Sequence, residues 1–219
     1  VSPAAFPAGR RPRQSQGFPS MALAFVFPGQ GSQAPGMGRD LAAAFPAARE
    51  VFGEVDEALK QNLSRLMFEG PSEDLTLTAN AQPALMAHSI AVLRVLEREG
   101  GFVLAEKVAL VAGHSLGEYS ALTAAGAFDL ATAARLLRLR GEAMQRATPP
   151  GTGAMAALLG AEPEAAAAIC AAARADPETG RDEVLEVAND NGGGQVVISG
   201  AAAAVDRAVA AAPGQGVKR

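Results

Sequence analysis

The segment Gly113-His-Ser-Leu-Gly117 carries the clearest chemical signal in the sequence. It fits the G-x-S-x-G pattern of a nucleophile elbow, in which a serine at a sharp strand-to-helix turn exposes its hydroxyl group. The two glycines let strand and helix approach closely, and the helix N-terminus directs backbone N–H groups toward a developing oxyanion. We therefore predict that Ser115 is a nucleophile. The alternative is a Gly/Ser turn without catalytic consequence.

A serine nucleophile needs a general base, and the sequence contains two histidines, His88 and His114. Adjacent side chains on a tight turn diverge, so we interpret His114 as a structural residue and not as the base for Ser115. His88 falls on the apolar face of a predicted helix, where a hydrogen-bonded core histidine is the simpler interpretation. The residues alone therefore leave the base unassigned.

Three further polar features have two interpretations each. Arg140 could be a fixed, bidentate carboxylate receptor or could lie on a solvated helix face. The segment Gly29–Gln33 could supply backbone donors to an oxyanion or could simply be a turn. Gly192-Gly-Gly194 lacks the Lys-Ser/Thr ending and the strand-to-helix setting of a phosphate-binding loop, so we do not expect nucleotide binding.

Composition narrows the classes of protein that fit. The chain has 219 residues, 49% of them hydrophobic, and a formal net charge of −4. This favours a globular α/β protein of one large domain, or one and a half smaller ones, and argues against nucleic-acid binding. The single cysteine, Cys170, excludes an intrachain disulfide, and two histidines leave little material for a metal site. No apolar run approaches the roughly 20 residues of a membrane span, so we expect no membrane partner.

Two short apolar runs, 22–27 and 108–112, predict buried strands, and each enters a glycine-containing loop. The second run leads directly to Ser115. Apolar spacing predicts helices between and after these strands, the second of them opened by Pro83. Their expected ranges are 39–60, 83–98, 116–125 and 129–147.

The pattern changes after Thr148-Pro-Pro-Gly-Thr-Gly153, the best linker candidate in the chain. We expect a strand, a helix, two strands around a Gly-rich turn at 189–195, and a final helix. Their ranges are 154–159, 162–175, 184–188, 196–199 and 201–212. This βαββα order is one strand short of a ferredoxin-like unit. The expected division of the chain is a disordered leader or upstream sequence at 1–20, a large domain at 21–148 and a partial small domain at 149–219.

Several motifs also occur together in a specific order. They are Phe27-Pro-Gly-Gln-Gly-Ser-Gln33, Gln82-Pro-Ala84, Gly113-His-Ser-Leu-Gly-Glu-Tyr119, Arg140-Gly141, Asn189-Asp-Asn191 and Gly194-Gln-Val-Val-Ile-Ser-Gly200. In order and spacing the chain, from Met21 to its end, resembles the malonyl-CoA:acyl-carrier-protein transacylases. The resemblance implies an α/β-hydrolase-like large domain with an inserted ferredoxin-like small domain. By the same resemblance, we expect the last strand of the small domain and the C-terminal segment of the large domain to lie outside these 219 residues.

The resemblance also implies roles for individual residues. Ser115 is expected to be acylated by malonyl-CoA, with the N–H groups of Gln30 and Leu116 as the oxyanion hole. Arg140 is expected to pair with the free malonate carboxylate. The other implied substrate-binding residues are Gln82, Asn189 and Asn191. The phosphopantetheine thiol of acyl carrier protein would then take the malonyl group from the ester, a step of fatty-acid synthesis.

The family's base is a histidine that follows the last strand of the small domain, and no residue of this sequence occupies that position. We therefore expect these 219 residues to be poorly active or inactive. The implied partners are malonyl-CoA, as substrate and not cofactor, and acyl carrier protein, in a complete enzyme that is cytoplasmic and monomeric. The alternatives are a serine hydrolase or thioesterase, an inert fragment that binds CoA or acyl carrier protein, and a domain of a larger polyketide or fatty-acid synthase.

Overall fold

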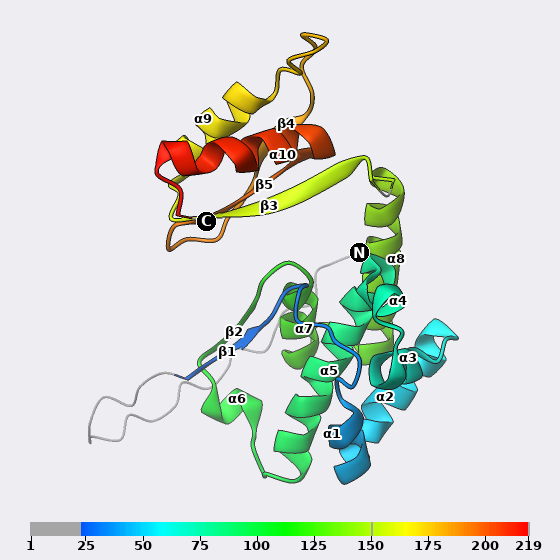
Figure 1. Ribbon diagram of the computed structural model, residues 1–219. Helices are drawn as coiled ribbons and strands as arrows, with labels where there is room; N and C mark the ends of the chain where they lie inside the picture. The colour runs from blue at the N-terminus through cyan, green and yellow to red at the C-terminus, as the bar shows by residue number, and fades with distance from the viewer. Residues whose placement is uncertain (1–22, 150, 219) are drawn as a thin grey trace, which may run out of the picture.

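The computed structural model describes residues 23–149 and 151–218. The predicted leader, 1–20, lies outside the described residues. Figure 1 shows the described chain as two lobes. The first lobe holds the blue and green elements before residue 150, and the second lobe holds the yellow to red elements after it. The connection between them runs from helix α8 (Leu130–Ala147) to strand β3 (Gly153–Leu159).

Two parallel strands form the sheet of the first lobe. β1 (Ala24–Phe27) pairs with β2 (Leu110–Gly113), so that Phe27 lies opposite Gly113. Both predicted strands are confirmed, but the prediction that they are buried is wrong for the described residues. Phe27 is buried, whereas Val26 is 73% exposed. Because the strands run in parallel, the segments that follow them emerge at the same edge of the sheet, next to Ser115.

The predicted helix 39–60 is two helices, α1 (Arg39–Ala44) and α2 (Pro46–Leu59). The break falls at Phe45, whose φ of −125° and ψ of 120° are extended. Pro46 explains the break because proline disfavours the helical conformation at the residue before it. Pro46 then occupies the first position of α2, where a missing N–H costs nothing.

The prediction that Pro83 opens a helix is wrong, because α5 (Thr78–Arg98) begins five residues earlier and includes it. The first turn of α5 is closed by the N–H groups of Asn80 and Ala81, which donate to the Leu77 carbonyl at 2.8 Å. Three short helices were not predicted from the sequence. They are α3 (Leu63–Glu69), α4 (Ser72–Thr76) and α6 (Leu104–Lys107).

α5 lies at the centre of the first lobe, and α2, α8 and α7 (Leu116–Ala124) pack against it. Its apolar face buries Met86 and Ile90, which join Val55, Leu116 and Leu137 in one core. Burying each large apolar side chain contributes about 1.5–3 kcal/mol. This packing holds α7 and α8, the helices that begin and follow the nucleophile elbow, in fixed positions against α5.

The second lobe has the predicted βαββα order. Its sheet has the order β3-β5-β4 and all pairs are antiparallel. The remaining elements are α9 (Pro163–Ala173), β4 (Leu185–Asp190), β5 (Gln195–Ala201), α10 (Ala202–Ala211) and a 3-10 turn at Ala212–Gln215. In Figure 1 the two helices lie together on one face of this sheet. The predicted turn at 189–195 is wrong at both ends, because Asn189 and Asp190 are the last residues of β4 and Gln195 is the first residue of β5.

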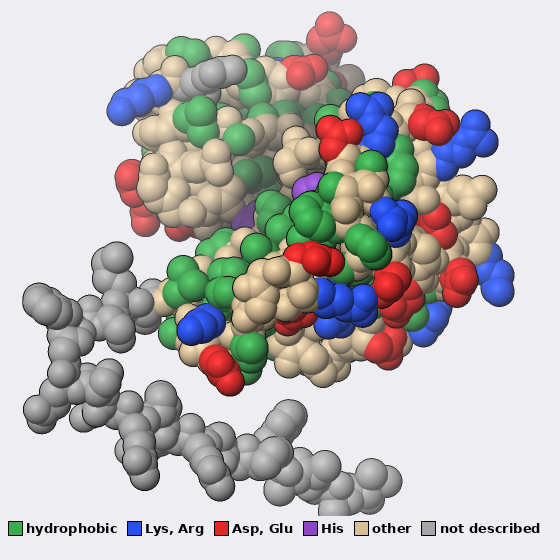
Figure 2. Space-filling view, turned by 90° about the horizontal axis from the view of Figure 1, so that it is seen from below, with side chains coloured by type: hydrophobic (Ala, Val, Ile, Leu, Met, Phe, Trp, Pro, Cys, Tyr) green, Lys and Arg blue, Asp and Glu red, His purple; other side chains and the backbone are tan. Residues whose placement is uncertain are grey.

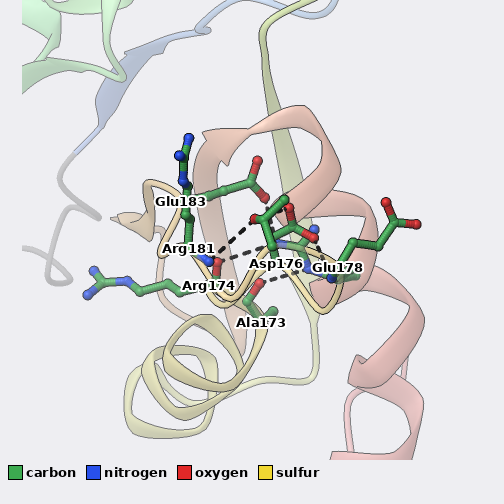
Figure 3. Close-up of polar contacts among 8 residues, drawn as sticks. Ala173, Arg174, Asp176, Glu178, Arg181 and Glu183 are labelled. Carbon is green, nitrogen blue, oxygen red and sulfur yellow. Dashed lines mark hydrogen bonds and ion pairs between the residues drawn. The ribbon is translucent and has the colours of Figure 1, made fainter.

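The loop between α9 and β4 is closed by polar contacts, shown in Figure 3. The Asp176 carboxylate accepts hydrogen bonds from the Thr179 hydroxyl at 2.5 Å and the Glu178 backbone N–H at 2.9 Å. These bonds lower the pKa of Asp176. From α10, Arg207 donates to Glu183 at 2.6 Å. The loop is thereby tied to itself and to the helix that covers the sheet, which fixes the start of β4.

Candidate functional site

Ser115 lies at the sharp turn between β2 and α7, as predicted. Its φ of 55° and ψ of −114° are unusual for a residue with a side chain. The turn is closed by hydrogen bonds from the Gly117 N–H to the His114 carbonyl at 2.9 Å and from the Glu118 N–H to the Ser115 carbonyl at 3.2 Å. A strained residue between strand and helix is typical of a functional turn, which favours the nucleophile elbow over an incidental one.

The two glycines of the motif are required by close packing. A Cβ atom at Gly113 would overlap the Gly117 carbonyl, and a Cβ atom at Gly117 would overlap the Phe27 carbonyl. No flexible side chain lies at either contact, so nothing could move aside. The N-terminus of α7 is therefore pressed against the edge of the sheet where β1 and β2 end.

Arg140 points at the serine. Its Nη2 donates to Ser115 Oγ at 3.0 Å, and its Nη1 donates to Gln82 Oε1 at 2.6 Å. Gln82 is fully buried, and its Nε2 contacts the Met144 sulfur at 3.3 Å. The guanidinium of Arg140 therefore has two side-chain partners within the described structure, and its role as a carboxylate receptor stays a prediction. One side of the guanidinium is hydrogen-bonded to the buried amide of Gln82, and the other is hydrogen-bonded to the hydroxyl group of Ser115.

Gly141 accounts for the position of Arg140. A Cβ atom at Gly141 would lie 2.6 Å from both the Ala79 Cα and the Thr78 carbonyl oxygen, so only glycine lets α8 approach α5 this closely. One turn later, the Gln145 side chain accepts a hydrogen bond from the Ala79 N–H at 2.7 Å. The pair Arg140-Gly141 thus combines a functional side chain with the close helix contact that aims it.

The two predicted oxyanion-hole residues follow the ends of the two parallel strands, Gln30 after β1 and Leu116 after β2. Leu116 is buried and opens α7, and Gln30 lies in the exposed loop after β1. Gln30 Nε2 donates to Thr78 Oγ1 at 3.2 Å. Within residues 23–149 and 151–218, the backbone N–H groups of Gln30 and Leu116 donate to no other backbone carbonyl. Both donors are therefore available to a ligand.

The predicted asparagines behave differently from each other. Asn191 Oδ1 lies 3.0 Å from His114 Nε2, so the second lobe meets the elbow at this point. Asn189 is exposed in β4, and its side chain has no hydrogen bond within the described residues. The structure therefore brings Asn191, but not Asn189, into contact with the group around Ser115.

Neither histidine is placed as a base for the serine. The ring of His114 is hydrogen-bonded to Asn191 and not to the Ser115 hydroxyl group. His88 is half-buried, and burial lowers its pKa. We expected a hydrogen-bonded core histidine, but the His88 side chain has no hydrogen bond within the described residues. Within those residues Arg140, and no histidine or carboxylate, is hydrogen-bonded to Ser115 Oγ.

A cleft of about 1100 Å³ separates the lobes, and Figure 2 shows the hollow with purple histidine atoms beside it. Thr78, Met144 and Gln145 line it from the first lobe, and apolar side chains such as Met155 and Val187 line it from the second. The sequence analysis missed these first-lobe residues. Thr78 lies four positions before Gln82 on α5, so the two side chains share a helix face. That spacing was the signal in the sequence that could have indicated Thr78 as a site residue.

The described residues hold no cluster of three or more His, Cys, Asp or Glu side chains that could bind a metal ion. Along the same stretches of chain, no helix is long and apolar enough to cross a membrane.

Comparison with protein families identifies one match. The model of the family described as "Acyl transferase domain" matches residues 24–219. The malonyl CoA-acyl carrier protein transacylase of Escherichia coli (strain K12) is 47% identical over 197 residues, which are 90% of this chain and 60% of that protein. The protein of the same name from Bacillus subtilis (strain 168) is 48% identical, over 90% of this chain and 59% of its own length. The chain therefore spans about 60% of the length of the curated relatives it matches.

Solved structures of similar proteins also match most of this chain. The acyl-carrier-protein-S-malonyltransferase from Bartonella henselae has a TM-score of 0.82 and 57% identity, over 91% of this chain and 61% of that one. A malonyl-transacylase solved in complex with a type II PKS acyl-carrier protein has a TM-score of 0.79 and 44% identity, over 90% of this chain and 61% of that one. The mixed α/β arrangement of the two lobes is that of these structures.

Proposed function

Because the chain belongs to the acyl transferase domain family, we propose that it carries the acyl-binding half of a malonyl-CoA:acyl-carrier-protein transacylase of fatty-acid synthesis. The observation that carries the proposal is the position of Arg140, whose guanidinium contacts both Ser115 Oγ and the buried Gln82. A cation fixed beside a nucleophile suits an acyl group that bears its own negative charge. The transacylase names of the relatives support the same substrate class.

The proposed reaction has two exchanges at one oxygen. Ser115 Oγ attacks the thioester carbonyl of malonyl-CoA, the C–S bond breaks, and the hydroxyl proton leaves with the CoA thiol. The thiol of the acyl carrier protein then attacks the serine ester, and the proton returns to Ser115 as the new thioester forms. In this proposal the N–H groups of Gln30 and Leu116 stabilise the oxyanion in both exchanges, and their lack of a backbone partner within the described residues supports this.

Arg140 has a different partner in each state of this cycle. Without substrate, it donates to Ser115 Oγ. A malonyl carboxylate in the same place would accept hydrogen bonds from the guanidinium in place of the Ser115 hydroxyl group, and this would release the hydroxyl group for attack. An acetyl group has no carboxylate, so it gives Arg140 no charged partner, and Nη1 stays bonded to Gln82. The proposed specificity for malonyl groups follows from this difference.

We also propose a finer description of the fold. We take the first lobe as part of an α/β-hydrolase-like domain and the second lobe as a ferredoxin-like small domain, with the boundary near residue 149. The strand-elbow-helix unit and the antiparallel β3-β5-β4 sheet with two helices support this. We further propose acyl carrier protein as the partner, a monomeric enzyme and a cytoplasmic location.

The test is transfer in a purified system. The chain is incubated with malonyl-CoA and the phosphopantetheinylated acyl carrier protein, and the products are resolved by mass spectrometry. Malonyl-carrier protein formed faster than in a no-protein control supports the transacylase. Free malonate as the main product favours the hydrolase, and a carrier-bound chain without either product favours the inert binding fragment.

A further inference from the structure

The two lobes meet through few groups. Each lobe has its own apolar core, and the helices and strands pack mainly within their own lobe. Within the described ranges, the one hydrogen bond between side chains of the two lobes joins His114 Nε2 and Asn191 Oδ1, at 3.0 Å. How the second lobe sits over the elbow therefore depends on this pair and on the chain that leads from α8 to β3.

Asn191 is held in place by its own turn. Its Nδ2 donates to Gln195 Oε1 at 2.9 Å, and its backbone N–H donates to the Gln195 carbonyl at 2.9 Å. Asp190 Oδ1 accepts the N–H of Gly192 at 2.9 Å, which tightens the same turn. With Nδ2 engaged inside the turn, the amide oxygen of Asn191 is directed at the first lobe. An amide oxygen accepts only, so the proton of this bond lies on His114 Nε2.

The other side of the His114 ring contacts the loop after β1. A Cβ atom at Gly29 would lie 2.8 Å from His114 Nδ1 and 3.2 Å from its carbonyl oxygen, so the Gly29 backbone packs on the ring without a side chain between. The backbone N–H of His114 donates to the Phe27 carbonyl at 3.2 Å. His114 thus lies between the loop that carries Gln30 and the turn that carries Asn191, one residue before Ser115.

We propose that His114 is a positioning residue, which sets the distance between the second lobe and the Ser115 elbow through Asn191. The consequence for catalysis rests on the proposed function: an acyl thioester must reach Ser115 next to the second lobe, and the His114–Asn191 bond holds that lobe against the residue before this serine. The distance between the lobes itself does not depend on the proposed function.

The first experiment measures that distance. Nitroxide labels are attached to the full chain through Glu106→Cys on α6 and Asp206→Cys on α10, two exposed positions, while Cys170 is buried. Double electron–electron resonance then gives the distance distribution between the lobes. We expect His114→Ala and Asn191→Ala each to broaden it. His114→Gln, which keeps a donor of similar reach, restores the narrow distribution. The control Gln215→Ala, which removes an exposed amide of the second lobe that makes no hydrogen bond to the first lobe, leaves it unchanged.

The second experiment measures malonylation of Ser115 at increasing malonyl-CoA concentration. Losing one exposed neutral hydrogen bond predicts about a fivefold rise in the half-saturating concentration for His114→Ala and for Asn191→Ala. We expect the maximal rate to change less than about twofold, and the double variant to be no worse than either single variant, since both remove the same bond.

An unchanged distance distribution in both alanine variants, or additive effects in the double variant, would overturn the proposal. So would a failure of His114→Gln to restore the narrow distribution. If His114→Ala does not fold, Asn191→Ala decides, because it leaves the elbow untouched. If the unaltered chain forms no malonyl adduct, that result bears on the proposed function and not on His114, and the distance distributions alone decide the role of His114.

Discussion

Arg140 Nη2 lies 3.0 Å from Ser115 Oγ, while the same guanidinium is held through Nη1 by the fully buried Gln82. The arginine comes from the helix after the elbow helix and the amide from the long central helix, so three elements converge on one hydroxyl group. A guanidinium oriented before substrate arrives loses little entropy when it binds a carboxylate. The substrate preference of the site is therefore expected to depend on this arginine.

Arg140→Ala should remove the preference for malonyl over acetyl groups. The unaltered arginine attracts the malonyl carboxylate, whereas an acetyl group gives its Nη2 no charged acceptor, a difference of about 1–3 kcal/mol. Removing it should lower the malonyl-to-acetyl ratio of Ser115 acylation rates at least about tenfold. The measurement is the rate of adduct formation with malonyl-CoA and with acetyl-CoA. Arg135→Ala, on an exposed position of the same helix, is the matched control. An equal ratio in the Arg140→Ala and Arg135→Ala variants would mean that Arg140 does not select the acyl group.

Gln82→Glu should weaken malonyl selection without removing the arginine. A buried carboxylate in place of the amide would pair with Arg140 and compete with the substrate for its charge. We expect the malonyl-to-acetyl ratio to fall in Gln82→Glu. Gln82→Met, which keeps the volume but removes the acceptor, should reduce it less. A ratio that stays constant across both variants would show that the contact behind the arginine has no role in selectivity.

Gly141→Ala should destabilise the first lobe, because the new methyl group would press against the backbone of α5. Overpacking of this kind costs about 1–3 kcal/mol. Gly53→Ala is the matched control, since Gly53 is also helical and a methyl group there would meet no neighbouring element within 4 Å. At that position alanine should stabilise the helix by up to about 1 kcal/mol. Urea unfolding followed by circular dichroism should move the midpoint down for Gly141→Ala and not for Gly53→Ala. A Gly141→Ala midpoint at or above that of the unaltered chain would contradict the close contact of α8 with α5.

The cap of α8 should make stability depend on pH. Asp129 Oδ1 accepts the Thr132 backbone N–H at 2.6 Å and Oδ2 accepts the Thr132 hydroxyl at 2.9 Å, and these bonds lower the pKa of Asp129 below its ordinary 3.8. A lowered pKa in the folded state means that the stabilisation is full above the ordinary pKa and is lost as the pH falls through the folded one. Asp129→Asn keeps an acceptor that does not titrate. The unaltered chain should therefore lose more stability than Asp129→Asn between about pH 7 and about pH 3. Equal losses in urea midpoint would exclude a contribution from this carboxylate.

The strand-elbow-helix unit could be predicted from the sequence because its signals are local. An apolar run, two glycines and a helical pattern follow one another directly along the chain, and the close packing at Gly113 and Gly117 explains why the pattern is strict. The order of elements in the second lobe was predictable for the same reason. The length of β4 was not, because Asn189 and Asp190 are turn-forming residues that pairing with β5 holds in the strand.

The partners of the site residues could not be predicted, because they come from distant parts of the chain. Arg140 and Gln82 are 58 positions apart, and His114 and Asn191 are 77 apart. Local patterns place each residue on an element, but only the packing of α8 on α5, or of one lobe on the other, decides which side chains meet. Exposure of β1 and β2 was missed for the same reason, since an apolar run does not reveal what covers it.

The site of acylation is the most direct test of Ser115 as the nucleophile. The chain and its Ser115→Ala variant are each incubated with malonyl-CoA, quenched in acid, digested and mapped by mass spectrometry. We predict one malonyl group on the peptide that contains Ser115, and none on the corresponding peptide of the variant. A malonyl group that persists in Ser115→Ala, or one found on another residue of the unaltered chain, would contradict the assignment.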